Sequence, residues 1–173
     1  GDYLVADYGS LGLWQFDGLD WSQIRSDDPD NRANTMVAYS SGLAVDFGTL
    51  GLWLFDGADW TQLNENDPQW LALYGDYLVA DYGSLGLWQF DGLDWSQIRS
   101  DDPDNRANTM VAYSNGLAVD FGTLGLWHFD GADWTQLNEN DPQWLFLWGD
   151  RLVQDHGGLY LREDDPDDAD EDG

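Results

Sequence analysis

The chain has 173 residues, of which 42% are hydrophobic and 15% aromatic, and its 34 acidic and 6 basic residues give a formal charge of −28. A polyanion of this size repels nucleic-acid phosphates and anionic membrane surfaces, so we expect neither as a partner. There is no cysteine, which excludes disulfides, thiolate metal sites and thiol nucleophiles.

Disorder is not expected despite the acidity, because 11 Trp, 8 Tyr and 7 Phe supply ample apolar surface for a core. No apolar run approaches the roughly 20 residues that cross a bilayer, so membrane insertion is not expected. No signal peptide is recognisable, and the chain begins inside a repeat, so we expect it to belong to a longer sequence.

An internal duplication dominates the sequence. Residues 1–76 match residues 75–150 at an offset of 74, and only four pairs differ: Ser41/Asn115, Leu54/His128, Ala72/Phe146 and Tyr74/Trp148. Each copy holds two related units, so five units begin at Leu4, Leu43, Leu78, Leu117 and Leu152. The fifth unit is degenerate and lacks the Asp-Gly turn of the others.

Four short strands are predicted in each complete unit, and none of the segments shows a helical period. In chain order they are "TMVAYS" or "WLALYG", "LVADYG", "GLWQFDG" and "DWSQI", each rich in β-branched or aromatic residues and ending at a turn residue. The connections have hairpin length. The exception is the link "RSDDPDNRAN" or "NENDPQ", whose proline must leave the sheet.

Antiparallel four-stranded units in series predict an all-β fold, a β-propeller of about five short blades. Strands with apolar residues on both faces fit blades that are covered on both sides, and we expect Trp14 and Trp21 to pack onto the next blade. Another all-β repeat array, such as an open solenoid, is the alternative.

The order strand, Asp-Gly-x-x-Trp, strand resembles the Asp-box hairpins and related short motifs of β-propeller repeats. The Asp box places a residue between its Asp and Gly and a Ser or Thr before the Asp, and "FDGLDW" has neither. The resemblance therefore implies a hairpin within a blade and assigns no catalytic residue.

The strand-like segments number eighteen, two fewer than five complete blades need. The first blade would lack its inner strand and the last its outer strand. The ring could close imperfectly within one chain, or a homo-oligomer could share strands between chains. We place the repeat domain at 1–163 and expect the acidic tail 164–173 to be disordered.

Acidic side chains recur at two positions. The first set occupies one equivalent position in all five units: Asp7, Asp46, Asp81, Asp120 and Asp155. These carboxylates either cap a turn or form a ring that holds a cation at one mouth of a channel. The other set is expected to stabilise the Asp-Gly turns: Asp17, Asp56, Asp91 and Asp130.

The long links carry further oxygen ligands that could bind Ca²⁺, although their spacing is not that of an EF-hand and a solvated loop is the simpler interpretation. The candidate metal ligands are Asp27, Asp28, Asp30, Asp67, Asp102 and Asp141, with Asn31, Glu65 and Asn66 beside them. No other cofactor is expected.

Ligand-binding candidates come from the pairs that differ between the copies: Tyr74, His128, Phe146 and Trp148. Phe146 and Trp148 enlarge the aromatic surface on one face of a strand. Either they fill space beside the degenerate last unit, or they form an aromatic ligand surface of the kind that binds sugars. Ser41/Asn115 resembles ordinary surface drift.

Catalysis finds little support, because the two histidines do not recur and repeated aspartates are expected in turns. The sequence favours a non-enzymatic, lectin-like binding or scaffold module for glycan or protein, in an extracellular or cell-surface setting that suits its acidity. The alternatives are a purely architectural repeat segment, and a recent or engineered amplification without a ligand.

Overall fold

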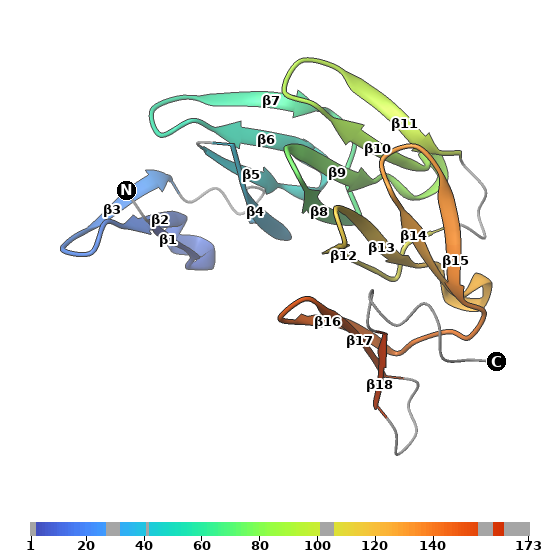
Figure 1. Ribbon diagram of the computed structural model, residues 1–173. Helices are drawn as coiled ribbons and strands as arrows, with labels where there is room; N and C mark the ends of the chain where they lie inside the picture. The colour runs from blue at the N-terminus through green and yellow to red at the C-terminus, as the bar shows by residue number, and fades with distance from the viewer. Residues whose placement is uncertain (1–2, 27–31, 41, 101–105, 156–160, 165–173) are drawn as a thin grey trace. The chain divides into compact units, whose positions relative to one another are not determined.

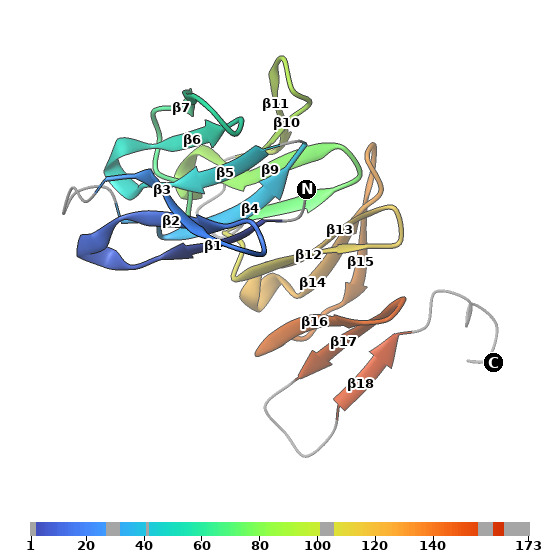
Figure 2. The ribbon, with the colours of Figure 1, turned by 90° about the vertical axis from the view of Figure 1, so that its left-hand side faces the viewer.

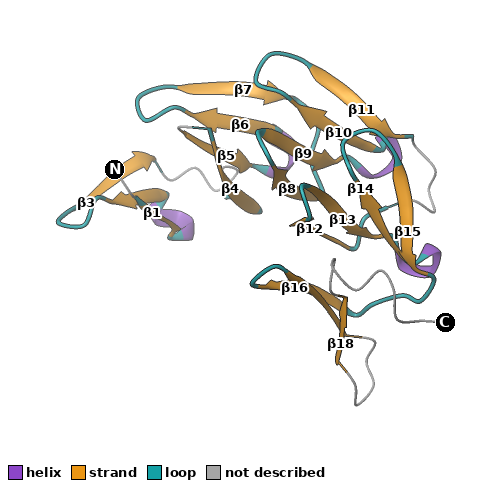
Figure 3. Ribbon diagram, viewed as in Figure 1, coloured by secondary structure: helices purple, strands orange, loops and turns teal. Residues whose placement is uncertain are grey.

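The structure is a computed structural model that describes residues 3–26, 32–40, 42–100, 106–155 and 161–164, the last four by their backbone only. Strands dominate it (Figure 3). The first two groups are β1 (Leu4–Asp7), β2 (Leu13–Phe16), β3 (Trp21–Arg25), and β4 (Thr35–Tyr39), β5 (Gly42–Asp46), β6 (Leu52–Phe55), β7 (Trp60–Asn64). The others are β8 (Trp70–Tyr74), β9 (Tyr77–Asp81), β10 (Leu87–Phe90), β11 (Trp95–Arg99), then β12 (Thr109–Tyr113), β13 (Gly116–Asp120), β14 (Leu126–Phe129), β15 (Trp134–Asn138), then β16 (Trp144–Trp148), β17 (Arg151–Asp155), β18 (Leu161–Asp164).

These strands form five antiparallel sheets, each a meander of consecutive strands. The first sheet is β1–β3, the second β4–β7, the third β8–β11, the fourth β12–β15 and the fifth β16–β18. The three middle sheets have four strands and the two end sheets have three. The expected all-β fold and the expected shortfall at both ends are therefore confirmed in the described residues.

The link between the second and third strands of each repeat holds a turn that the sequence did not predict. A single 3-10 turn follows β1, β5, β9 and β13, at Gly9–Leu11, Gly48–Leu50, Gly83–Leu85 and Gly122–Leu124. Each ends at a glycine in the left-handed region, such as Gly86 with φ 81°, a conformation that glycine adopts without steric cost.

The chain divides into two compact units, residues 1–68 and 69–173. In the first unit, Leu13 of the first sheet packs with Val45 and Phe47 of the second. In the second unit, the first strands of the three sheets, β8, β12 and β16, lie side by side (Figures 1 and 2). Two buried clusters fill the spaces between its sheets, one on either side of the fourth sheet.

In two repeats, the tryptophan that follows the Asp-Gly turn packs on the preceding sheet, whereas the sequence predicts a contact with the next sheet for Trp21, the matching residue of the first sheet. Trp60 donates its indole N–H to the carbonyl oxygen of Ile24 in the preceding sheet, at 3.1 Å. Trp134 makes the same bond to Ile98 at 2.9 Å. The alternation in these strands shows which side chains share a face, but not whether that face meets the preceding or the following sheet.

Candidate functional site

A cavity of about 400 Å³ lies in the second unit, where the first hairpins of three successive sheets meet. The hairpins join β8 to β9, β12 to β13 and β16 to β17. The lining residues are Tyr74, Gly75, Ala112, Tyr113, Ser114, Asn115, Gly116, Leu147, Gly149 and Asp150. The lining therefore combines aromatic rings with a hydroxyl, an amide and one carboxylate.

Tight turns position these lining groups. Ser114 and Asn115 form a two-residue hairpin loop with φ of 48° and 62°, the positive values that a type I′ turn requires at both positions. The backbone of Gly116 comes next, and a Cβ there would lie 2.0 Å from the carbonyl oxygen of Phe129. Glycine is therefore required for this close approach.

His128 fixes the turn from the neighbouring strand. Its Nε2–H donates to the carbonyl oxygen of Tyr113 at 3.0 Å, and the two rings meet edge to face with centroids 5.7 Å apart. A carbonyl oxygen can only accept, so this bond places the proton on Nε2. The first copy has Leu54 at this position and cannot make the bond.

Tyr74 contributes a buried wall to the cavity. It is 5% exposed, its hydroxyl donates to Oε1 of Gln89, and its ring stacks on Tyr77 with centroids 5.3 Å apart. Burial raises the pKa of Tyr74 to about 12, with smaller contributions from Tyr77 and Asp130. The phenol therefore stays neutral and keeps its proton at physiological pH.

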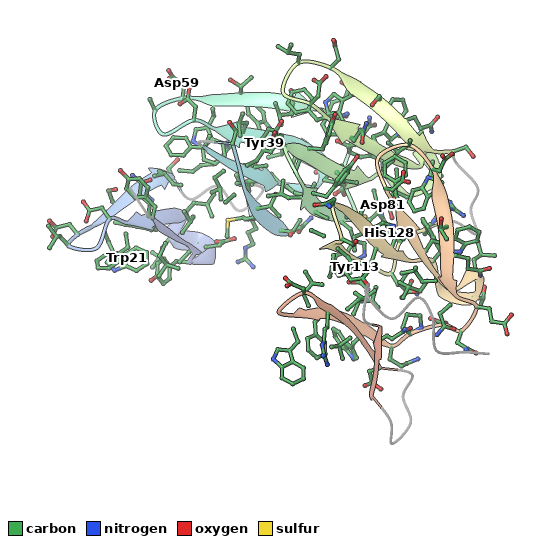
Figure 4. The ribbon with its side chains drawn as sticks, viewed as in Figure 1. Trp21, Tyr39, Asp59, Asp81, Tyr113 and His128 are labelled. Carbon is green, nitrogen blue, oxygen red and sulfur yellow. The ribbon has the colours of Figure 1, made fainter. Side chains whose placement is uncertain are left out.

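Of the four predicted ligand residues, the structure brings two to this cavity. Tyr74 lines it, and His128 lies beside Tyr113 (Figure 4). Phe146 and Trp148 are not among its lining residues and lie exposed on β16. Asn115 also lines the cavity, although its difference from Ser41 resembles ordinary surface drift in the sequence; its place in a predicted hairpin turn is the one signal that the sequence offers.

The repeated strand-end aspartates cap turns where their contacts are described. Oδ1 of Asp81 accepts from the backbone N–H of Gly83 at 2.7 Å, and its Oδ2 accepts from Ala107 at 2.9 Å. Asp7 makes the same pair of bonds with Gly9 and Ala33. Each carboxylate therefore ties the long link that follows its sheet back to a strand end.

Burial shapes the acidity of these carboxyls. Asp46, Asp81 and Asp120 are at most 1% exposed. Desolvation raises the pKa of Asp46 to about 6, although the N–H of Gly48 opposes it, and desolvation also raises the pKa of Asp81 and Asp120. Such enclosed, hydrogen-bonded groups cap turns and do not present an open ring of carboxylates to a cation.

The Asp-Gly turns are built as predicted. Oδ1 of Asp17 accepts from the backbone N–H groups of Leu19 at 2.8 Å and Asp20 at 2.9 Å. The pKa of Asp17 is lowered, chiefly by the bond from Asp20. The same arrangement recurs at Asp56, Asp91 and Asp130.

The predicted calcium ligands are only partly described. Asp27, Asp28, Asp30, Asn31 and Asp102 lie outside the described residues, whereas Asp67 and Asp141 lie exposed in their links. Within the described ranges, no three acidic or histidine side chains gather as a metal site. No described helix is long and apolar enough to cross a lipid bilayer.

No protein-family model matches the chain, so none assigns its hairpins to a particular repeat family, and no curated protein matches it. Among solved structures, it is similar to a chain in the crystal structure of the Mitotic Checkpoint Complex, with a TM-score of 0.57 and 12% identity. The match covers 83% of this chain and 52% of that chain, so this protein spans about half the length of the chain it matches. That neighbour is a β-propeller, and the fold here is all-β of the propeller type, built from repeated antiparallel sheets.

Proposed function

We propose that this protein is a non-enzymatic binding module whose ligand, a neutral glycan, occupies the cavity between the first hairpins of the second unit. The cavity volume of about 400 Å³ lies within the range of small-ligand sites. Its lining offers what a sugar needs: the rings of Tyr74 and Tyr113, the amide of Asn115 and the hydroxyl of Ser114.

One observation carries this proposal. The two copies of the duplication differ at only four positions, and three of these pairs, all but Ala72/Phe146, place a residue in the cavity wall or against it. Asn115 lines it, His128 holds the carbonyl of Tyr113, and Tyr74 lines it from the other copy. Random drift would scatter four changes over the surface, whereas adaptation to a ligand concentrates them.

The charge of the molecule and of the cavity selects the ligand class. Against a formal charge of −28, an anionic ligand is repelled, and the carboxylate of Asp150 in the lining adds to that repulsion. Glycoside hydrolysis usually needs two carboxyl groups roughly 5–9 Å apart, and Asp150 is the one carboxyl group in the described lining. Binding without turnover is the chemistry that this set of groups supports. We place the protein at a cell surface or in an extracellular medium, where salt screens its charge.

A protein ligand is the second candidate. It is favoured by the likeness to a propeller chain whose structure is titled as a complex, since such folds present hairpin loops to partners. A protein would cover the cavity and extend over the exposed turns around it. A purely architectural segment would have neither ligand.

A glycan array, followed by isothermal titration calorimetry of its best hits, tests the proposal. Asn115→Ser and His128→Leu replace both residues by those of the first copy, Ser41 and Leu54, in the same repeat context. We expect each to weaken binding by about tenfold, the loss typical of one hydrogen bond or its support. Leu93→Ser is the control, since Leu93 is 86% exposed in a distant hairpin turn. An empty array, or hits that both variants bind unchanged, would refute a glycan site here.

A further inference from the structure

The fifth sheet leaves one face uncovered. Trp144, Phe146 and Trp148 alternate along β16 and therefore share a face, and they are 70%, 46% and 65% exposed. Leu145 points the other way and is buried with Tyr113 in the cluster beside the fourth sheet. The fifth sheet is thus covered by its predecessor and bears three large aromatic side chains on the opposite side.

The same face is an interface in the third sheet. The residues of β8 that match Phe146 and Trp148 are Ala72 and Tyr74, and they are only 7% and 5% exposed. They pack into the cluster shared with the fourth sheet, where Tyr74 meets Phe129 edge to face with centroids 6.0 Å apart. The repeat itself therefore shows what covers this face, namely the following sheet.

The first sheet has the complementary defect. Leu4 is 60% exposed, whereas Leu78, the same residue in an identical stretch, is fully buried. The matching residue of the fourth sheet, Leu117, is buried in the cluster shared with the third sheet. Leu4 therefore lies on the face that receives a preceding sheet.

Strand pairing shows a second gap beside this face. Among the residues that the structure describes, strand β1 pairs with β2 alone, while its counterpart β9 pairs with both β8 and β10. A sheet that packs onto the first sheet therefore meets a space at the level of the missing inner strand. Strand β16 is the inner strand of its sheet, and it carries Phe146 and Trp148 where β8 has the smaller Ala72 and Tyr74. These larger rings can fill the space that the missing inner strand leaves.

We propose that the aromatic face of β16 in one molecule packs on the exposed face of β1 and β2 in a second molecule, head to tail. The contact continues the sheet-on-sheet interface that the third and fourth sheets already make, using the repeat's own surfaces on both sides. A second copy also supplies chain length, because one copy spans only 52% of the propeller chain it resembles. Contacts of this heterologous kind leave one free face at each end, so they grow into a ring or a filament.

Light scattering coupled to size exclusion, across a wide range of protein and NaCl concentration, measures the association of the full chain. We expect the mass to rise above that of one chain with concentration, and to rise further with salt, which screens the repulsion between copies charged −28. A measured mass that stays at one chain under all conditions would overturn the proposal. This holds also if the two faces of the same chain meet each other, because no second molecule is then bound.

Two variants each disable one face. The double variant Phe146→Asp with Trp148→Asp puts charges on the aromatic face of β16, and Leu4→Asp puts a charge on the receiving face. We expect each to weaken association by about tenfold or more, as loss of central aromatic or apolar contacts does, while Leu93→Ser changes nothing. Circular dichroism confirms that each variant folds.

Mixing the two variants is the decisive measurement. Each retains one intact face, so a head-to-tail contact predicts that the mixture forms a one-to-one dimer that grows no further. The proposal is wrong if the mixture stays as separate chains while the parent associates. It is also wrong if each variant alone associates as strongly as the parent, because the copies then join through another surface.

Discussion

The guanidinium carbon of Arg99 lies 4.1 Å from the centre of the Phe121 ring, across the boundary between the third and fourth sheets. The same cation lies 5.0 Å from the ring of Trp127 and 4.8 Å from that of Trp134. Arg25 repeats the arrangement in the first unit over Phe47, Trp53 and Trp60. A cation enclosed by three aromatic rings is thus part of what joins one sheet to the next.

Arg99→Ala should lower the free energy of unfolding of the second unit by about 1–2 kcal/mol, because it removes a partly buried cation–π contact and the packing of the aliphatic stem. Arg99→Lys should retain part of this contribution, since the charge remains but the planar stacking does not. Urea unfolding followed by tryptophan fluorescence measures both. If Arg99→Ala unfolds like the parent, the stacked cation does not stabilise the sheet boundary.

The repeat made the strands predictable, but not their partners. Short alternating segments and hairpin turns predict β10 and its neighbours wherever "GLWQFDG" occurs. The direction in which Trp60 packs could not follow from the pattern, because the alternation in "WTQLN" shows which side chains share a face but not which neighbouring sheet that face meets. The clamp from Asp81 to Ala107 spans 26 residues, a separation at which a single sequence gives no pairing signal.

The candidate site was predictable only in part, for a similar reason. Tyr74 and His128 stand out in the sequence because they differ between the copies, yet Phe146 and Trp148 also differ and lie outside the cavity. The sequence could not separate them, since only the fold brings the turn at Asn115 next to Tyr74. A Ser-to-Asn difference is chemically small, so its importance arises entirely from its place in a hairpin that lines a cavity.

Gly116→Ala should destabilise the second unit by about 1–3 kcal/mol, the cost of forcing extra atoms into a packed region. A Cβ there would lie 2.0 Å from the carbonyl oxygen of Phe129 and 2.8 Å from Nε2 of His128, and the first of these is backbone that cannot move aside. The same urea experiment measures it, with Leu93→Ser as the surface control. A variant as stable as the parent would show that β13 and β14 are not this close.

Asp46→Asn should make the first unit less sensitive to pH. Burial raises the pKa of Asp46 from its ordinary value of 3.8 to about 6, so its contribution to stability is fully present below the lower value and is lost as the pH rises through the upper one. Asparagine carries no charge but keeps a side-chain oxygen that can accept from the backbone N–H of Gly48. In the parent this nitrogen lies 2.7 Å from Oδ1 of Asp46. We expect the variant to match or exceed the parent's stability at neutral pH.

Asp56→Asn in the same unit is the matched control, because the pKa of Asp56 is lowered, chiefly by the backbone N–H of Asp59. Its contribution is present above the ordinary value and is lost only as the pH falls below it, so this variant should lose stability at neutral pH. Unfolding curves at several pH values separate the two signs. If the free energy of unfolding of Asp46→Asn and of the parent changes with pH in the same way, burial does not raise the pKa of the Asp46 carboxyl.

The melting temperature should rise with NaCl, because the formal charge of −28 on a compact chain is self-repulsive and the Debye length shortens to about 8 Å at roughly 0.15 M salt. Differential scanning fluorimetry in NaCl, and in MgCl₂ and CaCl₂ at matched ionic strength, separates screening from binding. A rise common to all three salts reports screening alone. A further rise with CaCl₂ only, lost in Asp67→Asn or Asp141→Asn, would place calcium at the Asp-Pro links. A melting temperature that stays the same in all three salts would contradict this prediction. It would mean that repulsion between the acidic side chains does not limit the stability of the fold.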